Sequence, residues 1–275
     1  MYYKNELNFE YPERCDEHML EVDRKRKIKL DTEYPYLQKA WWFKLMRGVY
    51  WVLLNTIVFP LCRFVYGLRI HGKKNLKKHK KALKGGAITI SNHVFMWDYL
   101  CVLRAIRPHL AYFPAWKDNL EGGFGNAIRL SGGIPIPTES IHAMIKFKKA
   151  MEEVLESGKW MHFFPEGSLW FYYPDIRPFK KAVFQYAVKY DKPIVPISFS
   201  FRPRKGITKL FFGKKPQVDM HIGEPLLPNC ELPHLEAEAA LSKAAYHEMQ
   251  VMNGICPGDP TYNTDQNPLH YQKTM

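Results

Sequence analysis

Short apolar runs alternate with amphipathic segments from residue 85 to residue 252. Strands of the buried type are predicted over 87–90, 160–164 and 193–201, and the clearest helical pattern covers 141–157. An apolar run of this length bounded by turn residues is typical of a strand that is buried on both faces. Strands that alternate with helices predict an α/β domain. We therefore expect a mixed central sheet flanked by helices.

The remaining predicted elements complete this pattern. Helices are predicted over 99–106, 180–190 and 234–252, and further strands over 208–212 and 217–222. Residues 117–139 are rich in glycine and proline and are predicted to be mostly loop. The expected organisation is a polar extension 1–40, an apolar helical segment 41–67, a main domain 68–255 and a polar tail 256–275.

Positive charge is concentrated in one part of the chain. Lys and Arg number 40 against 27 Asp and Glu, which gives a net charge of +13. Residues 41–110 hold thirteen of these cations and one acid, and seven of the lysines fall within 73–84. Such a block favours an anionic partner, which can be a membrane surface, a phosphorylated substrate or nucleic acid. A solvated basic face is the alternative.

The apolar run 48–62 lies between Arg47 and Arg63. At fifteen residues it is shorter than the ~20 that a spanning helix needs, and Asn55 and Pro60 interrupt it. Its aromatic and cationic neighbours are typical of a helix that lies in the membrane interface. With the lysine block, the run predicts a monotopic protein on an anionic membrane surface. A buried core helix is the alternative, and a full span is less favoured.

The cysteine positions and the first forty residues indicate the cellular compartment in which the protein is expected. The five cysteines, at positions 15, 62, 101, 230 and 256, form no CxxC pair, so zinc and thioredoxin-like motifs are absent and a reducing compartment is expected. The first forty residues are charged, and no signal peptide is expected. These features allow the cytoplasmic face of a bacterial membrane or the cytosolic face of an organelle, and the compact build favours a bacterial inner membrane.

His93 and Asp98 have the spacing of a candidate catalytic pair. In one continuous helix, five residues turn about 500°, which would place the two side chains about 140° apart. They can meet if His93 lies in a loop and Asp98 in the first turn of the next helix, as the strand 87–90 and the cap residues Ser91-Asn92 predict. An Asp bound to one imidazole nitrogen leaves the other to take a proton from a hydroxyl, as a general base does in acyl transfer.

A second polar motif ends the predicted strand 160–164. Its sequence is Phe163-Phe164-Pro165-Glu166-Gly167-Ser168. A carboxylate followed by Gly can bind hydroxyl groups at the carboxyl end of a strand, where the sites of α/β proteins lie. A simple turn would also explain Pro-Glu-Gly.

Taken in order, these motifs resemble the glycerolipid acyltransferase family, of the 1-acylglycerol-3-phosphate acyltransferase type. The resemblance covers about residues 68–226 and closes with Gly223-Glu224-Pro225. Its four blocks are Ser91-Asn92-His93 through Asp98; Lys117 with Phe124-Gly125 and Gly132-Gly133-Ile134-Pro135-Ile136; Phe164-Pro165-Glu166-Gly167-Ser168; and Ile194-Val195-Pro196-Ile197.

The resemblance implies acyl transfer from a thioester, acyl-CoA or acyl carrier protein, to a lysolipid hydroxyl, with 1-acylglycerol-3-phosphate as the expected acceptor. His93 would be the general base and Asp98 the residue that orients it. The other residues that the resemblance places at the site are Glu166, Gly167 and Ser168 for the acceptor, and Asn92 and Pro196 for the acyl donor. No metal, no cofactor besides the acyl donor and no covalent acyl-enzyme are expected.

The chain departs from the family in its cations. The family usually has an Arg where this chain has Pro137-Thr138-Glu139, and a second Arg where it has Leu169-Trp170. Those arginines resemble phosphate clamps, and Arg is hard to replace for bidentate phosphate binding. Lys117, Arg177 and Lys180 are the candidates to replace them. Ordinary surface cations are the alternative.

The same residues bear on other possible functions. A phospholipid transacylase, or an acyltransferase for a non-phosphate acceptor, would use the same core, whereas intact His93, Asp98 and Glu166 argue against a non-catalytic membrane scaffold. Ser168 is followed by Leu169-Trp170 and so lacks the Gly of a nucleophile elbow, which argues against a serine hydrolase. The sequence has no helix-turn-helix, RNA-recognition or zinc signature, so we expect no nucleic-acid partner.

Overall fold

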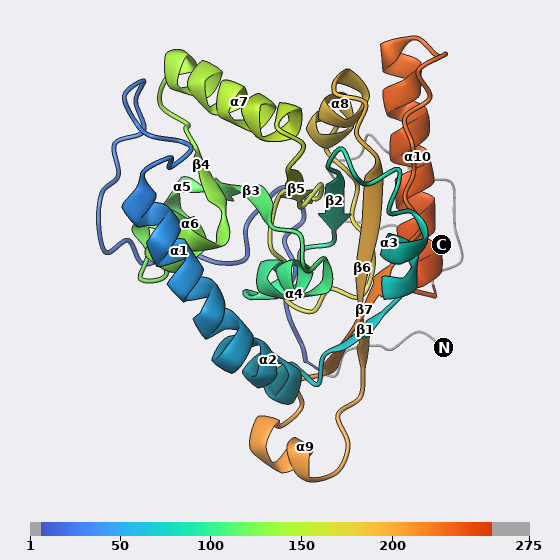
Figure 1. Ribbon diagram of the computed structural model, residues 1–275. Coiled ribbons are helices and arrows are strands. Elements are labelled where there is room, and N and C mark those ends of the chain that lie inside the picture. Colours follow the sequence, from blue (N-terminus) through green and yellow to red (C-terminus); the bar gives the residue numbers. More distant parts are fainter. Residues whose placement is uncertain (1–6, 255–275) are drawn as a thin grey trace.

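The computed structural model describes residues 7–254, and the predicted tail 256–275 lies outside them. A seven-stranded mixed sheet with helices on both faces forms the molecule (Figure 1), which confirms the predicted fold class. The strand order is β1-β7-β6-β2-β5-β3-β4. The strands are β1 (Arg69–His71), β2 (Ile88–Ser91), β3 (Ala111–Trp116), β4 (Gly133–Ile136), β5 (Trp160–Phe163), β6 (Ile194–Arg202) and β7 (Gln217–Ile222).

Strand direction brings the loops of the predicted motifs together. The strands β6, β2, β5, β3 and β4 are all parallel, whereas β7 runs antiparallel to β6. The carboxyl ends of these five parallel strands therefore share one edge of the sheet, here called the carboxyl edge. The loops after β2, β3 and β5 all begin there, as expected for the binding side of a parallel α/β sheet.

Two helical layers bury the sheet. On one face, α4 (Asp98–Ala105) and the helix formed by α1 (Trp41–Leu53) and α2 (Phe59–Tyr66) pack in a core cluster with β6 and β7. On the other face, α7 (Ile141–Glu156), α8 (Ala182–Lys189) and α10 (His234–Met252) pack against β2 and β5. The shorter helices are α3 (Lys73–Lys78), α5 (Lys117–Glu121), α6 (Gly125–Ser131) and α9 (Ile207–Phe212).

Some elements differ from the sequence predictions. Residues 208–212, predicted as a strand, lie in helix α9, which is bracketed by Gly206 and Gly213 at φ +64° and +58°. Residues 117–139, predicted as loop, contain α5, α6 and β4. Strand β3 was not predicted, because Pro114 lies inside it and proline supplies no N–H to a strand ladder.

The apolar segment forms one continuous helix, in agreement with the helical segment predicted at this place in the chain. α1 passes through a π-turn, Leu54–Val58, into α2, which makes 26 residues from Trp41 to Tyr66. The π-turn comes just before Pro60, whose ring cannot pack against a regular preceding turn. Asn55 Nδ2 donates to a backbone carbonyl one turn earlier at 2.6 Å. By length and composition this helix is sufficient to cross a membrane.

The helix from α1 to α2 lies along the domain with one side covered and one side open. Leu54 and Phe59 are buried, and Tyr50 Oη lies 3.1 Å from Ser131 Oγ of α6. The opposite side exposes large apolar side chains. These are Trp41, Leu45, Val49, Val52, Ile57, Leu61 and Phe64. Over most of its length the helix therefore presents an exposed apolar side.

Candidate active site

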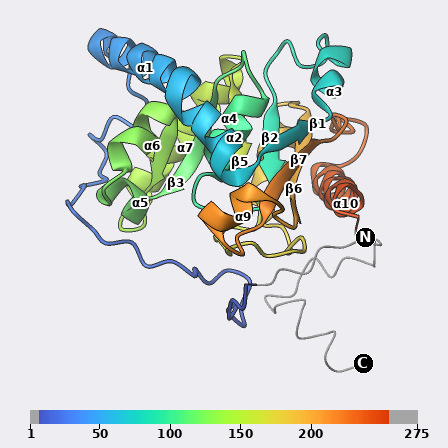
Figure 2. The same ribbon diagram turned by 90° about the horizontal axis from the view of Figure 1, so that it is seen from below.

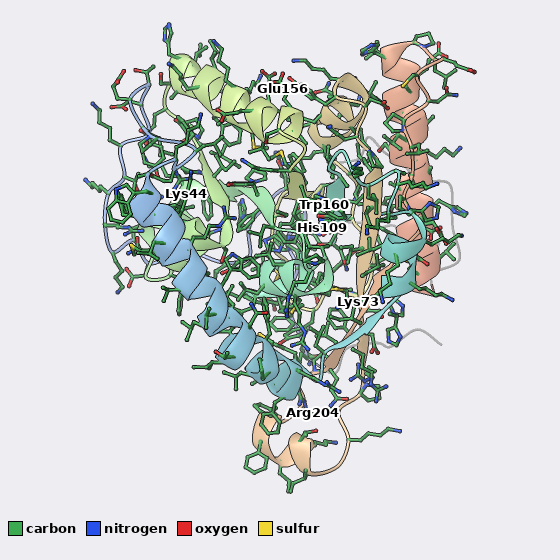
Figure 3. All side chains as sticks on the ribbon, in the orientation of Figure 1. Lys44, Lys73, His109, Glu156, Trp160 and Arg204 are labelled. Atoms are coloured by element: carbon green, nitrogen blue, oxygen red, sulfur yellow. The ribbon has the colours of Figure 1, made fainter. Side chains whose placement is uncertain are left out.

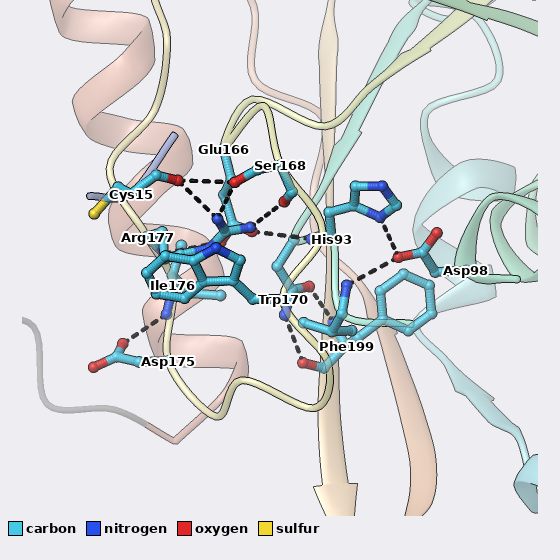
Figure 4. A network of polar contacts seen from close by, with 12 residues as sticks. Cys15, His93, Asp98, Glu166, Ser168, Trp170, Asp175, Ile176, Arg177 and Phe199 are labelled. Atoms are coloured by element: carbon cyan, nitrogen blue, oxygen red, sulfur yellow. Dashed lines mark hydrogen bonds and ion pairs between the residues drawn. The ribbon is translucent and has the colours of Figure 1, made fainter. Parts of the chain in front are cut away.

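His93 and Asp98 meet at the carboxyl edge, as their spacing predicted. Ser91 ends β2, residues 92–97 form a loop, and Asp98 begins α4. His93 Nδ1 lies 2.7 Å from Asp98 Oδ2, which also accepts the backbone N–H of Val94 at 2.9 Å (Figure 4). The Asp98 side chain is fully buried and that of His93 is 21% exposed. The carboxylate thus fixes the imidazole and leaves Nε2 on the side of the ring away from Asp98.

The segment after β5 clamps the His93 loop. The Phe164 ring stacks on the imidazole with centroids 3.9 Å apart and planes at 18°. The His93 carbonyl accepts the N–H of Trp170 at 3.1 Å, and the Val94 carbonyl accepts that of Tyr172 at 2.8 Å. The imidazole is therefore held on both its ring and its backbone.

Glu166 positions His93 rather than facing the cavity. Its Oε2 accepts the backbone N–H of His93 at 3.0 Å and Arg177 Nη2 at 2.8 Å, and its Oε1 accepts the Arg177 backbone N–H at 2.8 Å. The two side chains are 1% and 0% exposed. Both carboxylate oxygens are thus occupied by protein donors, so the acceptor-binding role predicted for Glu166 does not match its place in the structure.

Ser168 and Arg177 are also turned away from the cavity. Both are fully buried. Ser168 Oγ donates to the Cys15 carbonyl at 2.8 Å and accepts Arg177 Nη1 at 2.6 Å (Figure 4). Arg177 Nη1 also donates to the Cys15 carbonyl at 2.9 Å, and its guanidinium lies 4.4 Å from the Trp170 ring centroid. These residues hold the N-terminal segment instead of an acceptor, which corrects their predicted placement.

Residues 7–28 cross the carboxyl edge and are here called the N-terminal strap. Trp170 Nε1 donates to the Glu17 carbonyl at 2.9 Å, and the Ile28 N–H donates to Glu121 Oε1 at 2.8 Å. The His18 ring stacks on Trp116 with centroids 4.4 Å apart. Burial lowers the pKa of His18, and nearby positive groups add to this effect. No sequence motif indicates the strap, because much of it is held through backbone groups.

A cavity of about 590 Å³ opens beside His93. This volume is within the usual range for a small-molecule site. Aromatic and aliphatic side chains form much of its wall, and the strap supplies one side. The apolar lining includes Leu20, Val22, Met96, Trp97, Tyr99, Phe113, Phe124, Ile128, Phe164 and Leu169. The His93 imidazole thus forms part of the wall of a mainly apolar cavity.

Gly167 lines this cavity, and Lys180 packs over Gly167. Gly167 has φ +82°, and a Cβ there would come within 2.7 Å of Lys180 Cε, so the lysine stem lies directly over the glycine. Lys117, by contrast, forms an ion pair with Glu139 and lies 3.8 Å from Glu121 Oε1. Among the three predicted cations, Lys180 alone is exposed, and it lies beside Gly167 of the cavity lining.

The two residues predicted for the acyl-donor side lie in the sheet instead. Asn92 Nδ2 donates to the Phe199 carbonyl at 2.9 Å, and Asn92 Oδ1 accepts the Phe199 N–H at 2.7 Å. Pro196 is buried in β6 beside Gly223. Neither residue lines the cavity. Asn92 therefore fastens the His93 loop to β6, a role that its cap-like position in the sequence did not reveal.

A second histidine, which no sequence motif indicates, lies next to strand β2, just before the His93 loop. His162 of β5 is buried, with Nδ1 3.0 Å from Thr89 Oγ1 and Nε2 3.4 Å from Ser91 Oγ. Burial lowers the pKa of His162 to about 3, so its ring is neutral near neutral pH. Within residues 7–254, no group of three or more His, Cys, Asp or Glu side chains could hold a metal ion.

Comparison with known proteins identifies an acyltransferase domain. Residues 67–200 match the family model described as Acyltransferase. The chain therefore carries a domain of the acyltransferase family, which confirms the family indicated by its sequence blocks. Among solved structures it is similar to the 1-acyl-sn-glycerophosphate acyltransferase PlsC from Thermotoga maritima, at 18% identity and a TM-score of 0.48, covering 78% of this chain and 98% of that one. No curated protein matches the chain.

Proposed function

We propose that this acyltransferase transfers a fatty acyl group from a thioester, acyl-CoA or acyl carrier protein, to the free hydroxyl of a lysolipid in phospholipid synthesis. The observation that carries the proposal is the imidazole of His93. Its Nδ1 is held 2.7 Å from the buried Asp98 carboxylate, and the ring lines an apolar cavity of about 590 Å³. A general base beside an apolar pocket is what acyl transfer to a lipid hydroxyl requires.

The proposed reaction uses His93 Nε2 as the base. Nε2 takes the proton of the acceptor hydroxyl while the hydroxyl oxygen attacks the thioester carbonyl carbon. The tetrahedral intermediate then expels the thiolate, which receives the proton back from the imidazolium, so that ester and free thiol are formed. Asp98 stabilises the imidazolium in between and keeps Nδ1 protonated. The held backbone of His93 means that little reorganisation is needed at the base.

Lys180 is the proposed contact for a phosphorylated head group. The other two predicted cations are occupied, Lys117 by carboxylates and Arg177 by Glu166 and the strap. Lys180 is exposed and lies over Gly167, which lines the cavity. A single ammonium can bind a phosphate as a point charge, without the bidentate geometry of Arg. This placement supports 1-acylglycerol-3-phosphate as the acceptor.

The proposed location is the cytoplasmic face of a membrane, with α1–α2 lying in the interface. Support comes from the open apolar side of that helix and from its packing along the domain. Exposed Lys44 and Arg63 flank the apolar side chains, as anionic lipid favours. Among the described residues, Cys62, Cys101 and Cys230 form no disulfide, which fits a reducing compartment.

An acyl-transfer assay in mixed micelles, read by mass spectrometry, tests the proposal. The donors are palmitoyl-CoA, palmitoyl carrier protein and phosphatidylcholine; the acceptors are lysophosphatidate, lysophosphatidylcholine and monoacylglycerol; the His93→Ala variant is the blank. We expect phosphatidate from a thioester donor and lysophosphatidate. Product from phosphatidylcholine as donor would indicate a transacylase instead. If no pair gives a product that depends on His93, the proposed function is wrong.

A further inference from the structure

Helix α9 carries an exposed apolar surface that the candidate site does not use. Ile207, Leu210 and Phe211 are 69%, 85% and 71% exposed. They lie on one lobe, residues 203–216, between β6 and β7, which projects from the body of the molecule (Figure 1). Scattered apolar residues are common on surfaces, whereas a cluster of large ones marks an interaction site.

The α9 lobe is fixed against the end of α2. Arg204 is 6% exposed and donates to the Lys215 carbonyl at 2.9 Å and to the Val65 carbonyl at 2.6 Å. Its guanidinium lies 4.7 Å from the centroid of Phe212, which meets Phe64 of α2 edge to face at 5.7 Å. α9 lies beside α2 when seen from below (Figure 2), and Arg204 lies where the lobe joins the body (Figure 3). The apolar surface of α9 thus continues that of α1–α2.

The topology places α9 on the same edge of the sheet as the candidate site. β6 runs parallel to β2, and Ser91 at the end of β2 pairs with Ile197. β6 continues for five more residues, to Arg202, and so extends roughly 16 Å beyond β2. His93 follows β2 and α9 follows β6, so both lie on the carboxyl edge, with α9 projecting farther.

Charge around the lobe selects the partner. Four exposed lysines surround the apolar residues, and no acidic residue occurs between 203 and 216. These are Lys205, Lys209, Lys214 and Lys215. An apolar tip within a ring of cations is typical of a segment that enters the head-group region of an anionic bilayer.

We propose that α9 is a second membrane contact, which together with α1–α2 turns the carboxyl edge and the His93 cavity toward an anionic lipid surface. The binding claim rests on exposed side chains outside the cavity and does not depend on the reaction. Its consequence for the reaction rests on the proposed function: a lysolipid acceptor would reach the cavity from the bilayer. Absence of acyl transfer by the wild-type protein would contradict the proposed function and leave the vesicle binding result unaffected.

Vesicle flotation of the full chain tests the contact. The test variant is Leu210→Ser/Phe211→Ser, and the matched control is Leu227→Ser/Leu235→Ser, whose side chains are 64% and 77% exposed. Leu227 follows Leu226, which bridges to Ile194 at the amino end of β6, away from the carboxyl edge. On vesicles of phosphatidylcholine and phosphatidylglycerol, we expect the partition coefficient to fall roughly tenfold for the α9 variant and to stay unchanged for the control. Wild-type binding by the α9 variant, or an equal loss in the control, overturns the proposal.

A fluorescent label at position 210 reports the contact directly. Leu210→Cys is labelled with an environment-sensitive dye in a Cys230→Ser/Cys256→Ser background, and the emission is recorded with anionic vesicles. A blue shift on vesicles, absent with the same dye at Leu235→Cys, is expected; no shift at position 210 overturns the proposal. Dimers of the lipid-free protein that Leu210→Ser/Phe211→Ser abolishes would assign the surface to a second copy and would also overturn it.

Discussion

Glu166 Oε2 accepts the backbone N–H of His93 at 3.0 Å. The same oxygen accepts Arg177 Nη2, and the guanidinium also holds the Cys15 carbonyl of the strap. One buried ion pair therefore joins the His93 loop, the segment after β5 and the N-terminal strap. A buried pair that loses one partner leaves an uncompensated charge, so this network is costly to break.

Replacing Glu166 is expected to affect the positioning of His93 more than acceptor binding. Glu166→Gln removes the charge opposite Arg177 and should lower the free energy of unfolding by about 3–5 kcal/mol. We expect kcat to fall while the acceptor KM is unchanged. Urea titration in detergent micelles and steady-state kinetics measure the two effects, with Glu139→Gln as the exposed control. A raised acceptor KM at unchanged stability would show instead that Glu166 binds the acceptor.

Lys180 is expected to distinguish phosphorylated from neutral acceptors. Lys180→Ala should raise the KM for lysophosphatidate and leave that for monoacylglycerol unchanged, because a neutral acceptor has no charge for the ammonium to bind. Its neighbour Lys181 is also exposed, and Lys181→Ala serves as the matched control. An equal effect of both substitutions on both acceptors would remove the head-group role of Lys180.

His162 is expected to make the fold sensitive to acid. Its pKa is about 3 in the folded protein and about 6.5 in the unfolded chain, so the unfolded state binds the proton first as the pH falls. This histidine should therefore cost about 2 kcal/mol of stability between pH 7 and pH 5, with the loss beginning near pH 6.5. His162→Gln should remove that part of the loss, whereas the exposed His247→Gln should not. Urea titrations at pH 7 and pH 5 measure the free energy of unfolding of each variant. If His162→Gln loses as much stability as the wild type between these pH values, the role of His162 is contradicted.

The strap is expected to contribute to donor selection. Val22 lines the cavity and faces Gly122, so a larger side chain there occupies space that an acyl chain would use. Val22→Trp should lower kcat/KM for palmitoyl-CoA by roughly tenfold and affect octanoyl-CoA much less. Lys27→Trp, on an exposed strap residue, is the control. Equal losses for both chain lengths would show that the strap does not shape the acyl site.

The sequence predicted the local parts of the site better than its long-range contacts. The strand-to-helix turn at His93 and Asp98 was predictable because the strand, the cap residues and the spacing lie within twelve residues. The pairing of Glu166 with Arg177 was not predictable. Both residues were predicted to contact the acceptor, whereas in the structure both side chains are buried against each other. The strap escaped prediction for a different reason: its polar sequence docks through carbonyls such as those of Cys15 and Glu17, which carry no side-chain signature.

The fold shows the same division. Helix α7 and strands β2, β5 and β7 follow directly from residue periodicity. Helix α9 was predicted as a strand because its apolar run is too short to show a helical period. The flanking glycines and the packing of Phe212 on Phe64 and Arg204 determine its helical form. A helical segment over 41–67 was predicted, but its π-turn was not, because a π-turn that accommodates Pro60 leaves no sequence signal of its own.

The central claim is that His93, oriented by Asp98, is the general base. The most direct measurement is thiol release from palmitoyl-CoA in the presence of the acceptor identified for the wild type, compared for wild type, His93→Ala and Asp98→Asn. Circular dichroism confirms that each variant is folded. Both substitutions should reduce kcat by roughly 10²–10⁴-fold. Turnover within a few-fold of the wild type in folded His93→Ala would contradict the account.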